Sequence, residues 1–307
     1  MEALADFLLL HFGWAQNPLV VARQLLAAIS NGMLLFLISA GLSLIFGVSR
    51  IVNFAHGALF MLGAYLALTI TVAGPGSIGV FAAALAGATA GLYALGAVVE
   101  VGLLRRIYRA PHEFQLLLTF ALVFIVGDVV KLVWGREDYS VPTPALLTGS
   151  TRALGVTFPT YRLFLIAFGL LVAGALWFIL HRTRWGVMVR AATMDRQMLS
   201  ALGINTRQLF TAVFAVGAAL AGLGGALAAP IVAVGPALHV QVIIDAFVVV
   251  VIGGMGSVAG ALVGSLLVGL VNAFGVLAFP ALAVVLTFAL MALVLVVRPW
   301  GLFGTPE

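Results

Sequence analysis

The run LAAISNGMLLFLISAGLSLIF, residues 26–46, is interrupted by only four polar side chains, Ser30, Asn31, Ser39 and Ser43. A helix on the surface of a soluble domain carries a polar face, whereas this run is apolar on nearly every side. An apolar stretch of about 20 residues matches the roughly 30 Å hydrocarbon core of a bilayer. The run therefore predicts a membrane-spanning helix.

The composition extends this prediction to the whole chain. Of 307 residues, 64% are hydrophobic and 8% are charged, against roughly 25% charged in an ordinary soluble domain. The long continuous apolar runs disfavour a membrane β-barrel, which alternates over about ten residues. With no cysteine, the chain has neither a disulfide framework nor a thiolate metal site. We expect one all-α transmembrane domain over residues 1–307.

Eight apolar runs are long enough to be considered full spans. A ninth run, residues 243–252, would form a helix only about 15 Å long, which is half a bilayer. The eight expected spans are 24–46, 57–73, 79–104, 115–134, 161–180, 209–229, 260–275 and 281–297.

Basic residues between the spans indicate the orientation. Two connections are rich in arginine, 104–114 (with Arg105, Arg106 and Arg109) and 181–208, and the positive-inside rule places both in the cytoplasm. The proline-containing segment 135–160 is then an external loop. The same rule explains the net charge of +5 without nucleic-acid binding.

Arg298 should also be cytoplasmic, but simple crossings after residue 208 leave it outside. One more crossing would place Arg298 in the cytoplasm. Residues 243–252 provide it if they enter the membrane as a half-helix and the glycine stretch 253–256 completes the crossing. Residues 49–57 interrupt apolar sequence in the same way near the start. With both interrupted segments crossing, the N- and C-termini are expected in the cytoplasm.

The two interruptions occupy equivalent places in a weak repeat. Arg23-Gln24-Leu25 opens one long span and Arg207-Gln208-Leu209 opens another, and each is followed by an interrupted segment. Duplicated halves with broken helices are typical of transporters. The match covers three residues, so it supports the repeat only weakly.

The polar and glycine-rich residues at the interruptions are the candidates for a translocation path. Asn53, His56 and Gly57 could face a cavity, because polar groups inside membrane proteins tend to do so, or they could only satisfy loose backbone. Gly253, Gly254 and Gly256 are expected to make a tight turn at the end of the half-helix. Five scattered histidines without ligand spacing predict no metal site.

No motif in the chain predicts catalysis. The stretch 248–259 contains G-x-G-x-x-A, but a dinucleotide site needs an acidic residue about 20 positions later, and after Asp245 the only carboxylate side chain is Glu307. A nucleotide-binding G-x-x-x-x-G-K-[ST] loop is absent, so we expect no ATP hydrolysis, no cofactor in this chain and no enzyme activity. Asp128 and Lys131 are expected to form a local ion pair.

Residues 185–205 predict an amphipathic cytoplasmic helix. Its apolar face carries Val187, Ala191, Met194, Met198 and Leu202, and Gly203 is a plausible C-cap. Such a helix can rest on the membrane surface or dock a cytoplasmic partner. Its sequence alone leaves both readings open.

With these residues in view, the chain resembles the permease subunits of bacterial high-affinity branched-chain amino acid ABC transporters, over about residues 23–303. Three stretches carry the resemblance: GLSLIFGVSRIVNFAHG at 41–57, RAA at 190–192 with ALGIN at 201–205, and VIGGMGSVAG at 251–260.

The resemblance implies a multi-pass protein of the inner membrane that contacts lipid and forms half of a channel. A second homologous permease would form the other half. Two cytoplasmic ATPase subunits would carry ATP and magnesium, and a periplasmic binding protein would deliver the solute. Arg190, Asp195, Leu202, Gly203 and Asn205 would contact the ATPase. The family often has an acidic pair where this chain has Thr193-Met194-Asp195.

Other readings remain open on the residues alone. Related permeases look like carriers of urea, short amides or aromatic acids, so the solute is less certain than the class. Duplicated halves with broken helices also suit an ATP-independent secondary transporter. A membrane enzyme has little support, because Asp128, Asp245 and His56 are too scattered to form an acid/base set.

Overall fold

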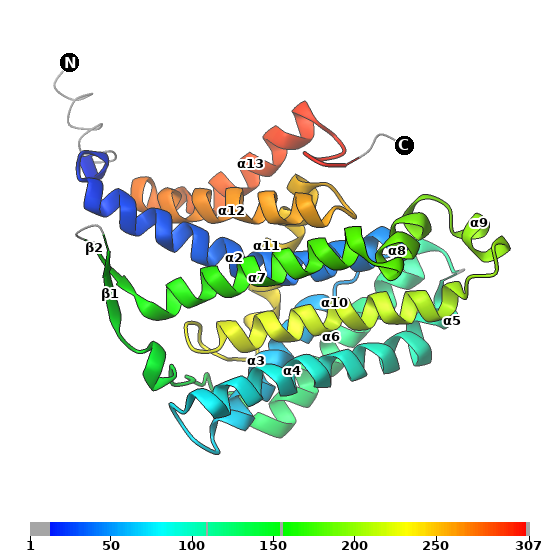
Figure 1. Cartoon of the computed structure of the whole chain (residues 1–307), viewed down its shortest axis with the longest axis horizontal. Helices are drawn as coiled ribbons and strands as arrows, with labels where there is room; N and C mark the ends of the chain where they lie inside the picture. Colours follow the sequence, from blue (N-terminus) through cyan, green and yellow to red (C-terminus); the bar gives the residue numbers. More distant parts are fainter. Residues whose placement is uncertain (1–12, 109, 154–155, 305–307) are drawn as a thin grey trace.

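The computed structural model describes residues 13–108, 110–153 and 156–304, and its main helices run side by side along the long axis (Figure 1). Arg109 lies outside the described residues. Among those described, seven helical segments are long and apolar enough to cross a membrane. They are α2 (Pro18–Ser49), α4 (Ile78–Val99) continued by η2 (Glu100–Leu104) and α5 (Arg105–Ile107), α6 (His112–Trp134), α7 (Thr160–Arg182), α10 (Thr206–Ala228), α12 (Val258–Ala278) and η4 (Pro280–Leu282) continued by α13 (Ala283–Val297).

Two further apolar helices are shorter, α3 (His56–Thr71) and α11 (Leu238–Gly253), with 16 residues each. Sixteen residues make a helix about 24 Å long, less than the hydrocarbon core. Each short helix follows a segment without helical structure, 50–55 or 229–237. The interruption expected at 49–57 is thus confirmed, but the expected full span 57–73 is one of the short helices.

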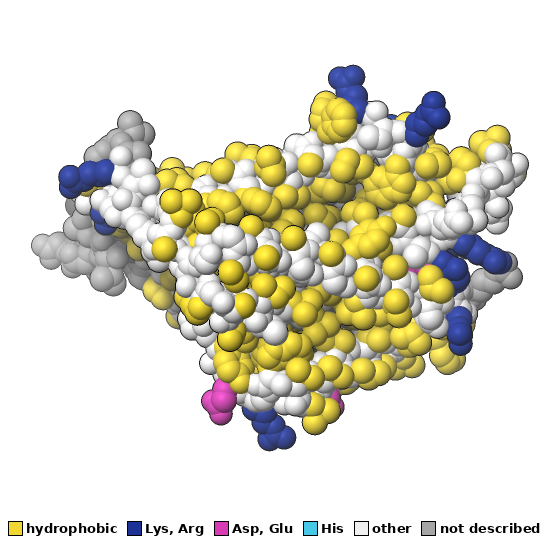
Figure 2. Space-filling view, turned by 60° about the horizontal axis from the view of Figure 1, so that its bottom comes forward, with side chains coloured by type: hydrophobic (Ala, Val, Ile, Leu, Met, Phe, Trp, Pro, Cys, Tyr) yellow, Lys and Arg dark blue, Asp and Glu magenta, His cyan; other side chains and the backbone are white. Residues whose placement is uncertain are grey.

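The surface carries the apolar belt expected of a membrane protein. Figure 2 shows hydrophobic side chains over most of one face, with charged side chains mainly at its margins. The sequence prediction of an all-α integral membrane protein is confirmed. One small hairpin accompanies the helices, β1 (Ser150–Ala153) paired antiparallel with β2 (Val156–Pro159), and it lies with η3 (Ala145–Leu147) in the predicted loop 135–160.

The start of α2 and the end of α13 lie at opposite ends of the bundle (Figure 1). Trp14, in η1 (Gly13–Gln16), contacts Phe274 near the end of α12, whereas residues after α13 pack against the end of α11. The described chain does not fit the prediction that both termini share one side, because α2 begins and α13 ends at opposite ends of the bundle. The difference came from counting 49–57 and 57–73 as two crossings, although they make one.

The second interruption also lies elsewhere than predicted. Residues 253–256 do not complete a crossing, because α11 itself reaches the end of the bundle, where Leu302 and Phe303 donate backbone hydrogen bonds to Ile252 and Gly253. The non-helical part of this crossing is 229–237, which precedes α11. It approaches the loop after α6 through a backbone bridge between Tyr139 and Val234.

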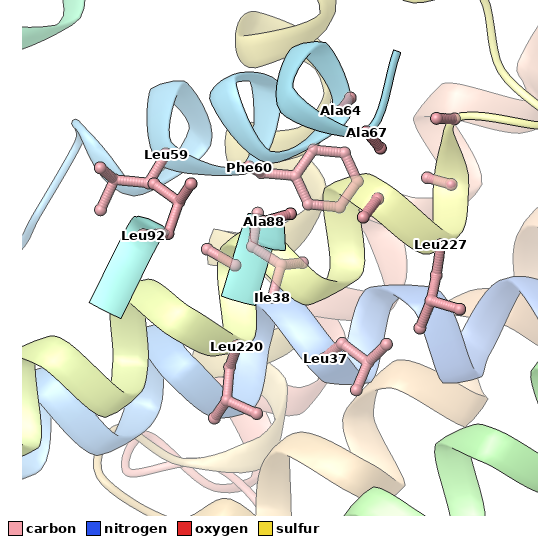
Figure 3. Packing of buried hydrophobic residues seen from close by; sticks show 14 of the residues in the cluster. Leu37, Ile38, Leu59, Phe60, Ala64, Ala67, Ala88, Leu92, Leu220 and Leu227 are labelled. Carbon is pink, nitrogen blue, oxygen red and sulfur yellow. The ribbon is translucent and has the colours of Figure 1, made fainter. Parts of the chain in front are cut away.

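In the core, helices of one half of the repeat, α2–α3–α4, pack against helices of the other half, α10–α11–α12. α2 packs along α12, and α10 packs along α4 and α3. Figure 3 shows Leu37, Phe60, Leu92 and Leu220 from α2, α3, α4 and α10 meeting in one cluster. Since α2 runs toward the end that α10 leaves, the repeat is inverted, and Arg23 lies at the opposite end from Arg207.

Glycine allows the closest of these approaches. A Cβ at Gly225 of α10 would overlap the carbonyl oxygen of Phe60 in α3, and one at Gly63 would overlap the backbone of Gly222. Small residues that let helix backbones approach closely are a common packing device in membranes, where the hydrophobic effect does not drive helices together. The α3–α10 seam therefore has no space for larger side chains.

Candidate functional site

The residues at the first interruption are enclosed by protein. Asn53 and His56 are 1% and 0% exposed. Asn53 Oδ1 accepts a hydrogen bond from the backbone N–H of Ala55, and His56 Nε2 lies 3.0 Å from the carbonyl oxygen of Ile38. A Cβ on Gly57 would come within 2.5 Å of the His239 carbonyl oxygen. These contacts hold the start of α3 against α2 and α11.

The three glycines predicted at the second interruption lie in a turn at the end of the bundle, after α11. Gly254 and Gly256 have φ values of +100° and +89°, which side chains disfavour. Gly254 packs against the backbone of Gly301 and Gly304, and Gly253 against Gly260. The tight turn is confirmed. The path-lining role of these glycines, and of Asn53, His56 and Gly57, stays a prediction.

The predicted amphipathic helix is two helices, α8 (Arg184–Met194) and α9 (Arg196–Ala201). They separate at Asp195, whose backbone is extended and whose Oδ1 accepts hydrogen bonds from Gln197 and Met198 N–H groups at 2.8 and 3.0 Å. The expectation of one continuous helix is wrong, because Asp195 caps α9 instead of continuing α8. Asn205 caps α10 in the same way, and Gly203 ends α9 with φ +81°.

The α8–α9 segment is firmly seated on one side. Val189, Ala192 and Leu199 are buried against a cluster that includes Leu44 and Phe210. Arg50 donates a hydrogen bond to the Thr193 carbonyl oxygen at 3.3 Å. The segment therefore contacts the ends of both α2 and α10.

The opposite side of α8–α9 is apolar and exposed. Its large side chains are Val187 (54% exposed), Met194 (89%), Met198 (58%) and Leu202 (71%). Arg190 is exposed beside them. The segment lies at the end of the bundle (Figure 1). A rigidly held apolar surface of this kind suits docking of another protein.

A buried carboxylate near this segment was missed by sequence reasoning. Glu100 is fully buried in η2, a π-helical turn, and its carboxylate accepts hydrogen bonds from Arg105 at 2.9 Å, Tyr108 at 3.1 Å and Thr211 at 2.6 Å. Burial and the neighbouring Glu100 carboxylate raise the pKa of Tyr108. The only sequence signal was an acidic residue inside an apolar run, followed five positions later by arginine.

The network links the end of the α4 segment to the start of α10. Thr211 Oγ1 also accepts a hydrogen bond from Arg105 and lies 3.0 Å from the Arg207 carbonyl oxygen. π-helical turns often occur at functional sites. The network therefore ties the end of the α4 segment to the start of α10, in addition to the packing of α10 along α4.

Residues 24–295 match a family model described as branched-chain amino acid transport system, permease component. The chain belongs to this family. It is 30% identical over 295 residues to the high-affinity branched-chain amino acid transport system permease protein BraD of Pseudomonas aeruginosa, covering 93% of this chain and 96% of BraD.

Other permease proteins are also similar to this chain. LivH of Escherichia coli K12, another high-affinity branched-chain amino acid permease protein, is 28% identical over 307 residues, covering 95% of this chain and 98% of LivH. The fructose import permease protein FrcC of Rhizobium meliloti is 33% identical over 101 residues, 31% of this chain. No solved structure matches significantly. The family assignment makes the chain a multi-pass permease component of a transport system.

Proposed function

We propose that this permease is half of the membrane channel of an ABC importer for branched-chain amino acids or similar small solutes. A second homologous permease completes the channel. Two cytoplasmic ATPase subunits, which hold ATP and magnesium, drive it, and a periplasmic binding protein delivers the solute. The observation that carries the ABC assignment is the exposed apolar side of α8–α9, seated on α2 and α10.

The orientation follows from charge. The α8 end of the bundle carries Arg105, Arg106, Arg182, Arg184, Arg190, Arg196, Arg207 and Arg298. From the positive-inside rule we infer that this end lies on the cytoplasmic side of the inner membrane and the hairpin end on the periplasmic side. Because the chain has no native cysteine, single cysteines can report this directly. A membrane-impermeant maleimide should label Thr148→Cys in intact spheroplasts and Ser200→Cys only after permeabilisation; the reverse result contradicts the orientation.

The docking surface is tested by substituting residues that the fold does not need. Met194→Glu with Leu202→Glu places two charges on the exposed side of α8–α9. The ATPase subunits should no longer co-purify with the permease, and ATP-dependent import should stop. Leu146→Glu, at an exposed position (74%) in the loop at the opposite end, is the matched control and should retain the ATPase. Retention by the double variant would refute ATPase docking here and favour a membrane-surface role.

A further inference from the structure

One half of α11 presents an open face. Val240 and Ile244 are 49% and 44% exposed, and Gln241 is exposed between them. Farther along the same helix, Val248 and Ile252 are 3% and 0% exposed, packed against α12 and α13. The open face therefore covers the first half of α11 and closes after residue 245.

Asp245 lies at the closed end of this open face. Its side chain is half-buried, and within the described residues it has no hydrogen-bond or ion-pair partner. The carboxylates on two other membrane-spanning segments are paired: Glu100 accepts three hydrogen bonds, and Asp128 lies 3.0 Å from Lys131. Asp245 is thus a membrane carboxylate that the described chain leaves without a partner.

The position of Asp245 is deep in the bundle. Eight residues separate it from Gly253 at the cytoplasmic end, a rise of about 12 Å, against a hydrocarbon core of about 30 Å. Ile243, about 3 Å from Asp245 along the helix axis, lies against Gly57 at the buried start of α3. A charged aspartate facing lipid at such a depth costs about 2.5–3.5 kcal/mol or more. A charged Asp245 must therefore face water, solute or another protein chain.

The other edge of the open face is aromatic. Phe247 contacts Phe54, with ring centroids 4.9 Å apart, and Phe54 stacks on Phe120 at 4.3 Å. On a helical wheel, Ile244 lies between Phe247 and Asp245. The open face therefore has a carboxylate on one side of Ile244 and an apolar ring on the other. These two groups match the ammonium group and the aliphatic side chain of an amino acid.

We propose that Asp245 lines the solute path and binds the ammonium group of an amino acid, while the amino acid's apolar side chain passes Ile244 and Phe247. This proposal rests on the importer function and adds a specificity residue to it. A carboxylate there attracts an ammonium group and repels an anionic acid that lacks one. It therefore favours amino acids over the aromatic acids, urea and amides that the sequence left open.

Cysteine protection tests the path directly. In the assembled importer with its binding protein, Gln241→Cys should react with a water-soluble, membrane-impermeant methanethiosulfonate, and excess leucine should slow the reaction at least fivefold. The protection should disappear in Gln241→Cys with Asp245→Asn. Leu171→Cys, exposed (66%) midway along α7, should stay unreactive as the lipid-facing control. No reaction at Gln241→Cys, or equal protection with and without Asp245, overturns the proposal.

Transport provides the second measurement. Asp245→Asn should lower leucine import at least tenfold, Asp245→Glu should restore part of it, and Asp128→Asn, which removes the exposed carboxylate of an ion pair, should leave it unchanged. Unchanged import by Asp245→Asn overturns the proposal, as does loss of the second permease from the purified complex, which would assign Asp245 to the subunit interface. If the unaltered complex shows no ATP-dependent import, the importer function itself fails.

Discussion

The two short helices, α3 and α11, have the same length and follow similar non-helical segments, yet their surroundings differ. α3 is enclosed by α4, α6, α10 and α11, and Phe60, Ala64 and Tyr65 are fully or nearly fully buried. α11 has Val240, Gln241 and Ile244 on an open face. An interrupted helix is therefore not by itself a path-lining element, because its neighbours decide whether its polar residues meet solute or backbone.

The largest effect should come from the α3–α10 seam. Gly225→Val places a branched side chain against the Phe60 carbonyl oxygen, which backbone on both sides prevents from moving. We expect a loss of about 3 kcal/mol or more in the free energy of unfolding, and little folded protein in the membrane. Yield after detergent extraction and thermal unfolding measure this. Gly127→Ala, which has nothing within 4 Å, is the control; a normal yield for Gly225→Val would show that the seam is loose.

A histidine at the start of each short helix allows a matched pair. His56→Leu removes the contact with the Ile38 carbonyl oxygen in a fully buried site, and an unsatisfied buried acceptor costs about 1–3 kcal/mol. His239→Leu, in the half-buried start of α11, should cost about 0.5 kcal/mol. Thermal unfolding in detergent compares the two. Equal losses would remove the distinction between an enclosed α3 and an open α11.

The open face should matter for transport and not for stability. Gln241→Leu changes an exposed residue, so the free energy of unfolding should shift by less than about 0.5 kcal/mol. Leucine import by the assembled complex should nevertheless fall several-fold, because the polar lining is reduced. Uptake and thermal unfolding on the same preparation separate the effects. Normal uptake would place the path on another face.

The smallest effect is expected inside α3. The hydroxyl group of Tyr65 is buried and has no hydrogen-bond partner among the described residues. Tyr65→Phe removes this polar atom and keeps the ring against Trp134, 5.1 Å away between centroids. The free energy of unfolding should stay the same or rise by up to about 1 kcal/mol. A clear loss of stability would indicate that the hydroxyl group is satisfied in the membrane-embedded protein.

Hydropathy was sufficient to predict most of the helices. The expected spans 115–134, 161–180 and 209–229 correspond to α6, α7 and α10 within a few residues. The start of α11 could not be predicted by hydropathy, because the polar residues His239 and Gln241 interrupt the apolar run there. In the structure both residues lie on the partly exposed first half of the helix. Burial against neighbours, which distinguishes α3 from α11, depends on tertiary packing that a single sequence does not show.

Some features of the candidate sites could be predicted from the sequence, and others depend on tertiary packing. The exposed apolar side of α8–α9 could be predicted, because spacing alone places Val187, Met194 and Leu202 together. The break at Asp195 could not, since the apolar pattern continues across it and only the cap hydrogen bonds reveal it. The Glu100 network joins residues 100 and 211, and no local pattern indicates that pairing. Asp245 stood out in the sequence only as an isolated carboxylate.

The hydrogen bonds from Leu302 and Phe303 to the end of α11 bear on how the protein is made. Their donors are synthesised after both α12 and α13, so a nascent chain inserting into the membrane holds α11 with those two carbonyl groups unpaired until the later segments arrive. The helix that carries Asp245 can reach its final state only after Leu302 and Phe303 have been synthesised. A stalled or truncated chain would expose this unfinished segment to membrane proteases.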